Sequence, residues 1–204
     1  MAMKAPFGTA TRSDVWLTLA LAVMGILVTL VDAIVRLVDV LPNRDVPVEV
    51  QAATPRQTID VPGVGDAVPA EIGQFTVRVS DLPFGTYVAV IGAAVAPAVA
   101  IVTVLVCLAW LLRNIGAGRF FSPLNTRLVT TAALATMVGW VVTTAMSTAA
   151  ANGALASLSA QDRPGFEVTM SVSFMWLFAA MVAGCVAAAF HTGERMQRDS
   201  EGLV

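Results

Sequence analysis

The sequence predicts an all-α membrane protein, a bundle of four transmembrane helices with a small β-containing extracytoplasmic loop between the first and second helices. Three observations lead to this fold class. The 204 residues are 57% hydrophobic and 13% charged, whereas soluble domains are about 25% charged. Four apolar runs are each long enough to cross a bilayer, which takes about 20 residues of helix. Two parts of the longest polar segment alternate between apolar and polar residues, as half-buried strands do.

The four spans are expected at residues 15–40, 87–112, 128–148 and 168–190. The first begins with VWLTLALAVMGILVTLVDAIV, which exceeds the apolar length of a signal peptide, about 7–15 residues. RLVDVLPN follows this run in place of a small-x-small cleavage site, so we expect an uncleaved span. The other segments are the N-terminus at 1–14, loops at 41–86 and 149–167, a connector at 113–127 and a tail at 191–204.

The connector between the second and third spans predicts the orientation of the protein. It carries Arg113, Arg119 and Arg127 and no acidic residue. Lys and Arg collect in short loops on the cytoplasmic side of a membrane. The connector and the two termini hold seven basic residues, whereas the two remaining loops hold four. We therefore expect both termini and the connector to be cytoplasmic.

The loop at residues 41–86 is too long for a simple connection. VPVEV at 46–50 and QFTVRVS at 74–80 alternate, so Phe75, Val77 and Val79 would share one face of a strand. Prolines and glycines between the two segments supply turns. The loop holds six acidic residues against three arginines. It is either a docking or sensing surface for a cationic partner or ion, or a solvated cap over the helices.

Asp32, Arg36 and Asp39 are spaced to lie on one face of the first helix. An ionisable group inside a membrane is a functional candidate. Asp32 lies roughly 25 Å along the helix from Val15, at 1.5 Å per residue, which places it near the outer headgroups. Two interpretations follow: a structural pair that helps to seat the outer loop, or a proton or ion relay.

Small residues recur at four-residue spacing in two spans, which lets helix backbones approach closely in lipid. This pattern indicates either packing within one bundle or self-association through the fourth helix. The residues are Ala135, Gly139 and Thr143 in the third span and Ala180, Gly184 and Ala188 in the fourth.

Residues with catalytic or ligating chemistry are sparse. Cys107 and Cys185 lie in apolar runs, where we expect them to pack as small hydrophobic side chains, and His191 is the only histidine. The sequence has no phosphate loop and no arrangement of nucleophile and base. We therefore expect no enzyme, no cofactor and no metal. The net charge of −2 gives no reason to expect direct contact with nucleic acid.

Two stretches on the expected cytoplasmic side resemble motifs of a known family. The connector region reads G-x-G-R-F-F-S-P-L-N-T-R-L over residues 116–128, and the chain ends F-H-T-G-E-R-M-Q-R-D-S-E-G-L-V over residues 190–204. Both resemble the YoaS-type bacterial four-helix membrane proteins, a domain-of-unknown-function family. The resemblance covers the four spans and both motifs and leaves the loop at 41–86 unmapped. The matching positions are Gly118, Phe120 or Phe121, Ser122, Asn125, Arg127, Leu128, Phe190, Gly193, Asp199, Leu203 and Val204.

The resemblance implies a protein of the bacterial inner membrane with no established catalysis. Some members are encoded beside a small helix-turn-helix regulator, which the resemblance adds to the possible partners. The other expected partners are the lipid bilayer and either another membrane protein or a second copy of this chain.

The connector also predicts local structure. Ser122 followed by Pro123 is typical of a helix start, with Ser122 as the N-cap and Pro123 at the first helical position. Asn125 and Arg127 would then lie in the first turn. We further predict that the acidic tail folds back onto the arginines of the connector. The tail acids are Glu194, Asp199 and Glu201.

The sequence thus predicts a non-enzymatic membrane protein that acts through contacts, as an interaction, accessory or sensing protein. The alternative is a subunit of a homo-oligomeric channel or transporter, in which the threonine-rich third span would line the pore. The interaction candidates are Asp32, Arg36, Asp39, Arg113, Arg119, Phe121, Asn125, Arg127, Gly184, Gly193 and Asp199.

Overall fold

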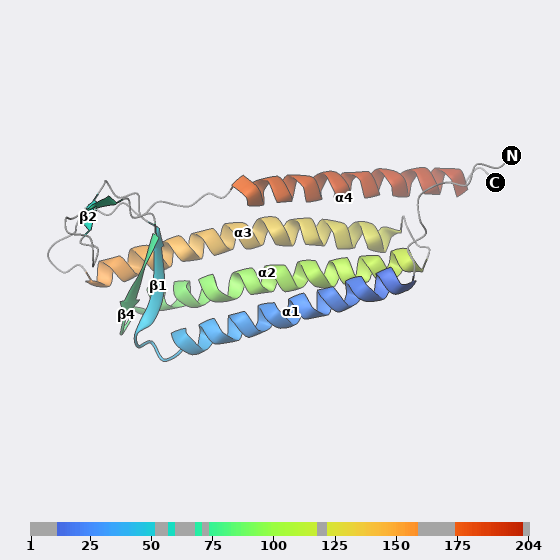
Figure 1. Ribbon diagram of the computed structural model, residues 1–204. Helices are drawn as coiled ribbons and strands as arrows, with labels where there is room; N and C mark the ends of the chain where they lie inside the picture. Colours follow the sequence, from blue (N-terminus) through green and yellow to red (C-terminus); the bar gives the residue numbers. More distant parts are fainter. Residues whose placement is uncertain are drawn as a thin grey trace. The chain divides into compact units, whose positions relative to one another are not determined.

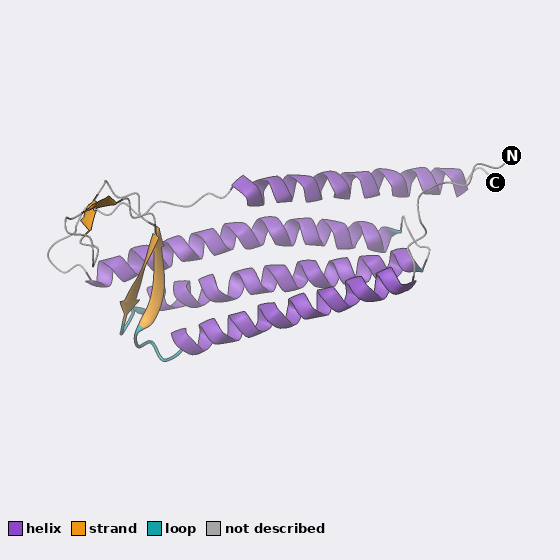
Figure 2. Cartoon of the chain, viewed as in Figure 1, coloured by secondary structure: helices purple, strands orange, loops and turns teal. Residues whose placement is uncertain are grey.

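The computed structural model describes residues 12–51, 57–59, 68–70, 74–117, 122–158 and 174–201. Within these residues the chain forms four helices and two small antiparallel sheets (Figures 1 and 2). The helices are α1 (Arg12–Val40), α2 (Phe84–Gly116), α3 (Pro123–Leu158) and α4 (Phe174–Glu201). The strands are β1 (Val46–Gln51), β2 (Gln57–Ile59), β3 (Val68–Ala70) and β4 (Gln74–Val79).

The described helices make this a multi-pass membrane protein. Three segments are long and apolar enough to cross a bilayer: Trp16–Val40, Phe84–Gly116 and Pro123–Leu158. Large apolar side chains along α1, such as Trp16, Val28 and Ile34, are more than half exposed, which suits contact with lipid rather than with water. The apolar part of α4, Phe178–Gly193, is shorter. Three of the four expected spans are therefore supported by the described helices.

Two helices extend well beyond the expected spans. α3 ends at Leu158 rather than near residue 148, because its last turns have their own packing surface. Ala150, Ala151 and Ala154 in those turns are almost fully buried. α4 continues through residues expected to form a tail and ends at Glu201. The loop at 149–167 and the tail at 191–204 are therefore partly helical.

The chain divides into two compact units. The hairpin unit consists of Asp32–Pro97 and Trp140–Ser173. The connector unit consists of Met1–Val31, Ala98–Gly139 and Phe174–Val204.

The hairpin unit is built around the pairing of β1 with β4. The strands are antiparallel, with Val46 opposite Val79 and Gln51 opposite Gln74. Val46, Val48 and Val50 on β1 are buried, whereas Glu49 is exposed. This confirms the strand alternation predicted from the sequence. β2 and β3 form a second antiparallel pair, in which Thr58 lies opposite Pro69.

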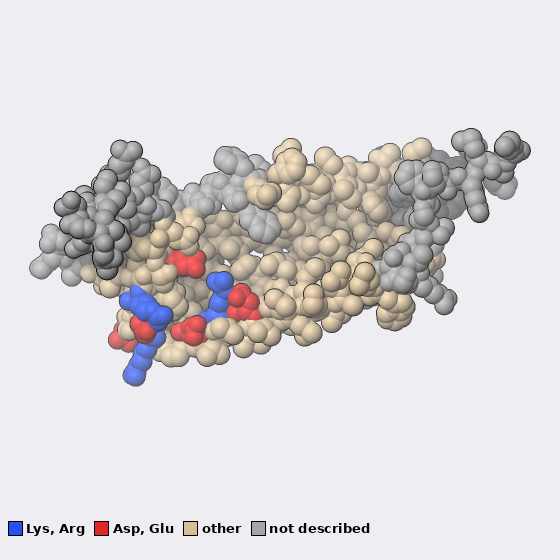
Figure 3. Space-filling model, viewed as in Figure 1, with Lys and Arg blue, Asp and Glu red and all other residues tan. Residues whose placement is uncertain are grey.

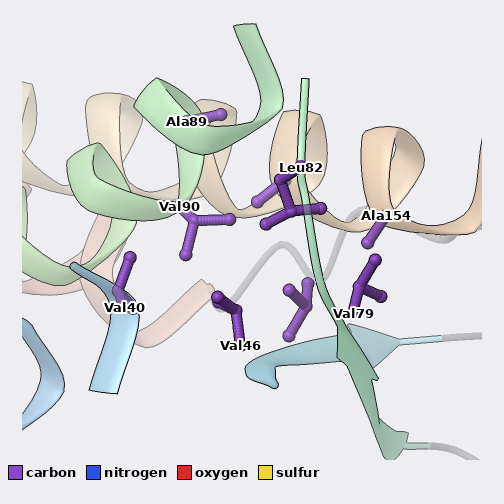
Figure 4. Close-up of a cluster of buried hydrophobic side chains, with 9 residues drawn as sticks. Val40, Val46, Val79, Leu82, Ala89, Val90 and Ala154 are labelled. Atoms are coloured by element: carbon purple, nitrogen blue, oxygen red, sulfur yellow. The ribbon is translucent and has the colours of Figure 1, made fainter. Parts of the chain in front are cut away.

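The apolar face of the β1–β4 hairpin packs on three helix segments of the same unit. Figure 4 shows these side chains converging from the two strands, the end of α1, the start of α2 and the end of α3. This cluster explains why α3 continues to Leu158: its last turns form part of the hydrophobic core. The cluster consists of Val40, Val46, Val48, Val79, Leu82, Ala89, Val90, Ala150 and Ala154.

Glycines mark close helix contacts in both units. In the connector unit, a Cβ on Gly139 would overlap the Ala100 side chain. In the hairpin unit, a Cβ on Gly153 would overlap Thr86, and one on Gly92 would lie 2.9 Å from Met146 Sδ. These contacts show that α2 and α3 pack with their backbones close together, as small residues permit in lipid. The predicted packing role of Gly139 is confirmed.

Candidate interaction surfaces

Two turns are joined at the base of the hairpin, one between α1 and β1 and the other between β4 and α2. Asn43 in the first turn makes most of the contacts to the second. The Leu82 N–H donates to Asn43 Oδ1 (3.0 Å), and Asn43 Nδ2 donates to the Leu82 carbonyl (3.3 Å). The Asp81 N–H donates to the Asn43 carbonyl (3.0 Å). We call this set of contacts, made by Asn43, Asp45, Ser80, Asp81 and Leu82, the clasp.

The rest of the clasp involves Asp45. Its N–H donates to Ser80 Oγ (2.9 Å), and its carboxylate accepts a hydrogen bond from Arg78 (2.7 Å). Asn43, Asp45 and Asp81 all have positive φ, between 50° and 56°. Asn and Asp tolerate this left-handed conformation better than other non-glycine residues. The clasp therefore holds both turns in conformations that few side chains permit.

The outward face of the hairpin is polar and exposed. We call it the hairpin face; it consists of Glu49, Gln74, Thr76 and Arg78. Gln74 Nε2 donates to Glu49 Oε2 (3.3 Å) across the strands. Figure 3 shows acidic and basic side chains gathered around this hairpin and the end of α1. Because the opposite face is buried on helices, the hairpin face is presented in a fixed orientation.

The expected charge pair near the end of α1 is present. Arg36 Nε lies 3.0 Å from Asp32 Oδ2, and both side chains are more than half exposed. Asp39 is also exposed, and within the described residues it has no ion-pair partner. The structure therefore brings together Asp32 and Arg36 but not Asp39. No bond joins the pair to the hairpin among the described residues, so the loop is seated by the clasp instead.

The connector unit contains the second candidate surface, which we call the connector surface: Arg113, Asn114, Ser122 and Arg127. The predicted helix start is confirmed, because α3 begins at Pro123. Ser122 Oγ accepts the Asn125 N–H (3.3 Å), and the Ser122 carbonyl accepts the Thr126 N–H (3.1 Å). These two bonds satisfy N–H groups that would otherwise lack partners in the first turn.

An asparagine pair links the two helices at the connector. Asn114 Nδ2, near the end of α2, donates to Asn125 Oδ1 in the first turn of α3 (2.8 Å). Asn125 is fully buried, so the bond is shielded from water and a lost partner is costly there. This position was expected to contact a partner. Its burial instead assigns it a structural role, which explains an Asn at this place in the motif.

The arginines of the connector surface are exposed. Arg113 lies in the last turn of α2, and Arg127 lies just after the first turn of α3. Neither has an acidic partner within salt-bridge distance among the residues that the structure describes. Arg119 and Phe121 lie outside the described residues.

The interaction candidates on α4 are Gly184, Gly193 and Asp199. A Cβ on Gly184 would meet nothing within 4 Å, so packing against another helix of the same chain is not seen at this position. Gly193 is half-buried on α4, and Asp199 lies in its last turns, where side chains are not described. Residues 191–201 continue α4 as a helix, and the docking of the acidic tail on the connector arginines stays a prediction.

The described residues offer little for metal or redox chemistry. No group of three His, Cys, Asp or Glu side chains within them could hold a metal ion. Cys107 is buried and Cys185 is exposed, and neither forms a disulfide.

Sequence reasoning missed Asn43, Ser80 and Asp81. The sequence did contain a signal, because Asn43 in LPNRD and Asp81 in SDLPF each lie within three residues of the end of a helix or strand. Such residues favour turns with positive φ. Which residues of the two turns meet depends on the register of β1 against β4. The sequence of a single turn does not specify that register.

Comparisons with known proteins give one match. A family described as Protein of unknown function (DUF2975) matches residues 52–203, well over half of the chain. The match includes most of the loop that the resemblance left unmapped and begins after α1 and β1. No curated protein and no solved structure matches the chain. The narrower YoaS-type assignment stays a prediction.

Proposed function

Because this multi-pass membrane protein belongs to the DUF2975 family of proteins of unknown function, we propose its role from its surfaces. It is a non-enzymatic accessory or sensing protein that contacts a partner membrane protein through the hairpin face. The observation that carries this proposal is the division of the hairpin into two faces. Val46, Val48 and Val79 are buried on the helices, so the polar face is held outward in one orientation and needs little ordering to bind.

The proposal includes the orientation of the chain. Residues 168–190 contain no charged side chain, and we take them as the fourth span, although the apolar part of α4 alone is shorter. Four spans place both termini on the same side, and the basic connector and termini favour the cytoplasm of a bacterium. The hairpin face is then extracytoplasmic. A helix-turn-helix regulator, if it binds, would meet the cytoplasmic connector instead.

A homo-oligomeric channel or transporter subunit is the second candidate. The open surroundings of Gly184 on α4 favour a contact with a second copy. The threonines of α3 give this candidate less support than the sequence suggested. Thr130 and Thr136 donate their hydroxyls to carbonyls of their own helix, those of Thr126 and Ala132, and such hydroxyls offer less to a pore.

A crosslinking experiment tests the proposal. A photoreactive amino acid replaces Thr76 on the hairpin face, or Val28 on the lipid-exposed side of α1 as a control. We expect Thr76 alone to capture a second protein in native membranes. Glu49→Lys should abolish this capture, whereas Asp39→Lys, an equal charge change at an exposed site off the hairpin, should not.

Purification in mild detergent separates the two candidates. A monomer carrying a stoichiometric second protein supports the accessory or sensing role. A closed homo-oligomer without another protein, together with crosslinks only between copies of the chain, would overturn it in favour of the channel subunit.

A further inference from the structure

We propose that the connector surface binds anionic phospholipid through Arg113 and Arg127, each of which meets a lipid phosphate. The inference uses the membrane placement of the helices but not the partner proposed for the hairpin face. It rests on the charge of two arginines that have no acidic partner among the described residues, on the apolar surfaces beside them, and on the asparagine pair that joins their helices.

The first argument is charge. In the hairpin unit, Arg36 is paired with Asp32 and Arg78 with Asp45. In the connector unit, the side chains that the structure describes include no Asp or Glu at all. Arg113 and Arg127 are exposed there without an acidic partner among the described residues. Two such cations favour an anion supplied from outside the unit.

The second argument is depth. Arg113 ends the apolar helix α2, and Arg127 lies near the start of α3. Trp110, one turn before Arg113, is 53% exposed, and Leu124, one turn before Arg127, is 49% exposed. Arginine and tryptophan at helix ends lie at the level of the lipid headgroups. A lipid bound there would place its phosphate at the arginines and its acyl chains along exposed apolar side chains.

The third argument is preorganisation. The Asn114–Asn125 bond (2.8 Å) ties the last turn of α2 to the first turn of α3. Arg113 adjoins Asn114, and Arg127 is two residues beyond Asn125, so the backbones that carry the arginines are fixed. Arginine binds phosphate through a planar fork of N–H donors. Fixing the backbones lowers the ordering cost of holding the two arginines at the level of the lipid headgroups.

The test measures lipid binding to the purified full-length protein. Native mass spectrometry in detergent follows titration with phosphatidylglycerol, with phosphatidylcholine as the neutral comparison. At about 1 kcal/mol for each arginine near anionic lipid, R113Q/R127Q should weaken phosphatidylglycerol binding about thirtyfold. The matched control R36Q/R78Q removes the same charge from the hairpin unit and should change binding less than threefold. R113K/R127K keeps the charge and the topology signal but loses the planar forks, so it should bind phosphatidylglycerol more weakly than the native protein and more tightly than R113Q/R127Q.

Several results would overturn the proposal. Equal losses in R113Q/R127Q and R36Q/R78Q would show a general charge effect, and equal binding of phosphatidylcholine would show that no anion is recognised. Displacement of phosphatidylglycerol by millimolar glycerol phosphate would assign the site to a soluble phosphate. Tighter lipid binding in E194Q/D199N/E201Q would show that the acidic end of α4, rather than a lipid, is the resident partner of the arginines.

Discussion

The hairpin unit and the connector unit treat their polar groups in opposite ways. In the hairpin unit, two turns with positive φ are joined by the clasp, and Arg36 and Arg78 are each paired with a nearby carboxylate. In the connector unit, one partly buried hydrogen bond between Asn114 and Asn125 joins the helices, while Arg113 and Arg127 stay exposed without described acidic partners. The first unit pairs two of its arginines with its own carboxylates. The second leaves its charges available to the membrane.

The clasp should give the largest effect on stability. Asn43→Ala removes two side-chain hydrogen bonds to Leu82 and places Ala at positive φ, which together cost about 2–3 kcal/mol. We expect the melting temperature in detergent to fall by several degrees. Asn43→Gly removes the same hydrogen bonds but places no Cβ at positive φ. It should therefore lower the free energy of unfolding by about 1 kcal/mol less than Asn43→Ala does. Equal losses in both variants would show that the backbone conformation is not strained for Ala.

The close contact of α2 with α3 should give the next largest effect. A Cβ on Gly139 would overlap Ala100, so Gly139→Ala forces the helices apart and should cost about 2 kcal/mol. Gly184→Ala is the matched control, because a Cβ there meets nothing within 4 Å. Its melting temperature should be unchanged or higher. Loss of an oligomer in Gly184→Ala would instead place a second copy of the chain against α4.

Substitutions in the Asn114–Asn125 pair should lower stability less, and the effects of the two substitutions should not be additive. Asn125→Ala leaves Asn114 without its described partner and should cost about 1 kcal/mol. Because hydrogen bonds between membrane helices average about 0.6 kcal/mol, a double-mutant cycle with Asn114→Ala should give a coupling energy of that size. The cycle is measured by thermal unfolding in detergent. Additive effects of the two substitutions would show that the bond contributes nothing to stability.

The paired charges of the hairpin unit should matter least for stability. Arg78 and Asp45 are both more than half exposed, and exposed pairs contribute about 0.2–1 kcal/mol. We expect Arg78→Gln to lower the melting temperature by no more than about one or two degrees. High salt should remove most of the difference from the native protein. A large loss that salt does not change would assign Arg78 to the clasp rather than to a solvated pair.

The sequence carried enough information for the parts of the fold with a local cause. Alternation located β1 and β4, the Ser122–Pro123 pair located the start of α3, and charge spacing located the Asp32–Arg36 pair. Two features have non-local causes and were missed. α3 continues to Leu158 because Ala150 and Ala154 pack under valines more than a hundred residues earlier. The burial of Asn125 depends on Asn114, which reaches it from the preceding helix.

The packing of the hairpin on the end of α3 has a consequence for biosynthesis. Ala154 is made about 75 residues after Val79, so at about 5–20 residues per second the apolar face of β1 and β4 waits roughly 4–15 s for its last helix. During that interval the valines on the apolar face of the hairpin are not covered by α3, and uncovered apolar strands promote mispairing between nascent chains. The rate at which α3 is synthesised and inserted therefore sets how long each new chain is exposed to aggregation.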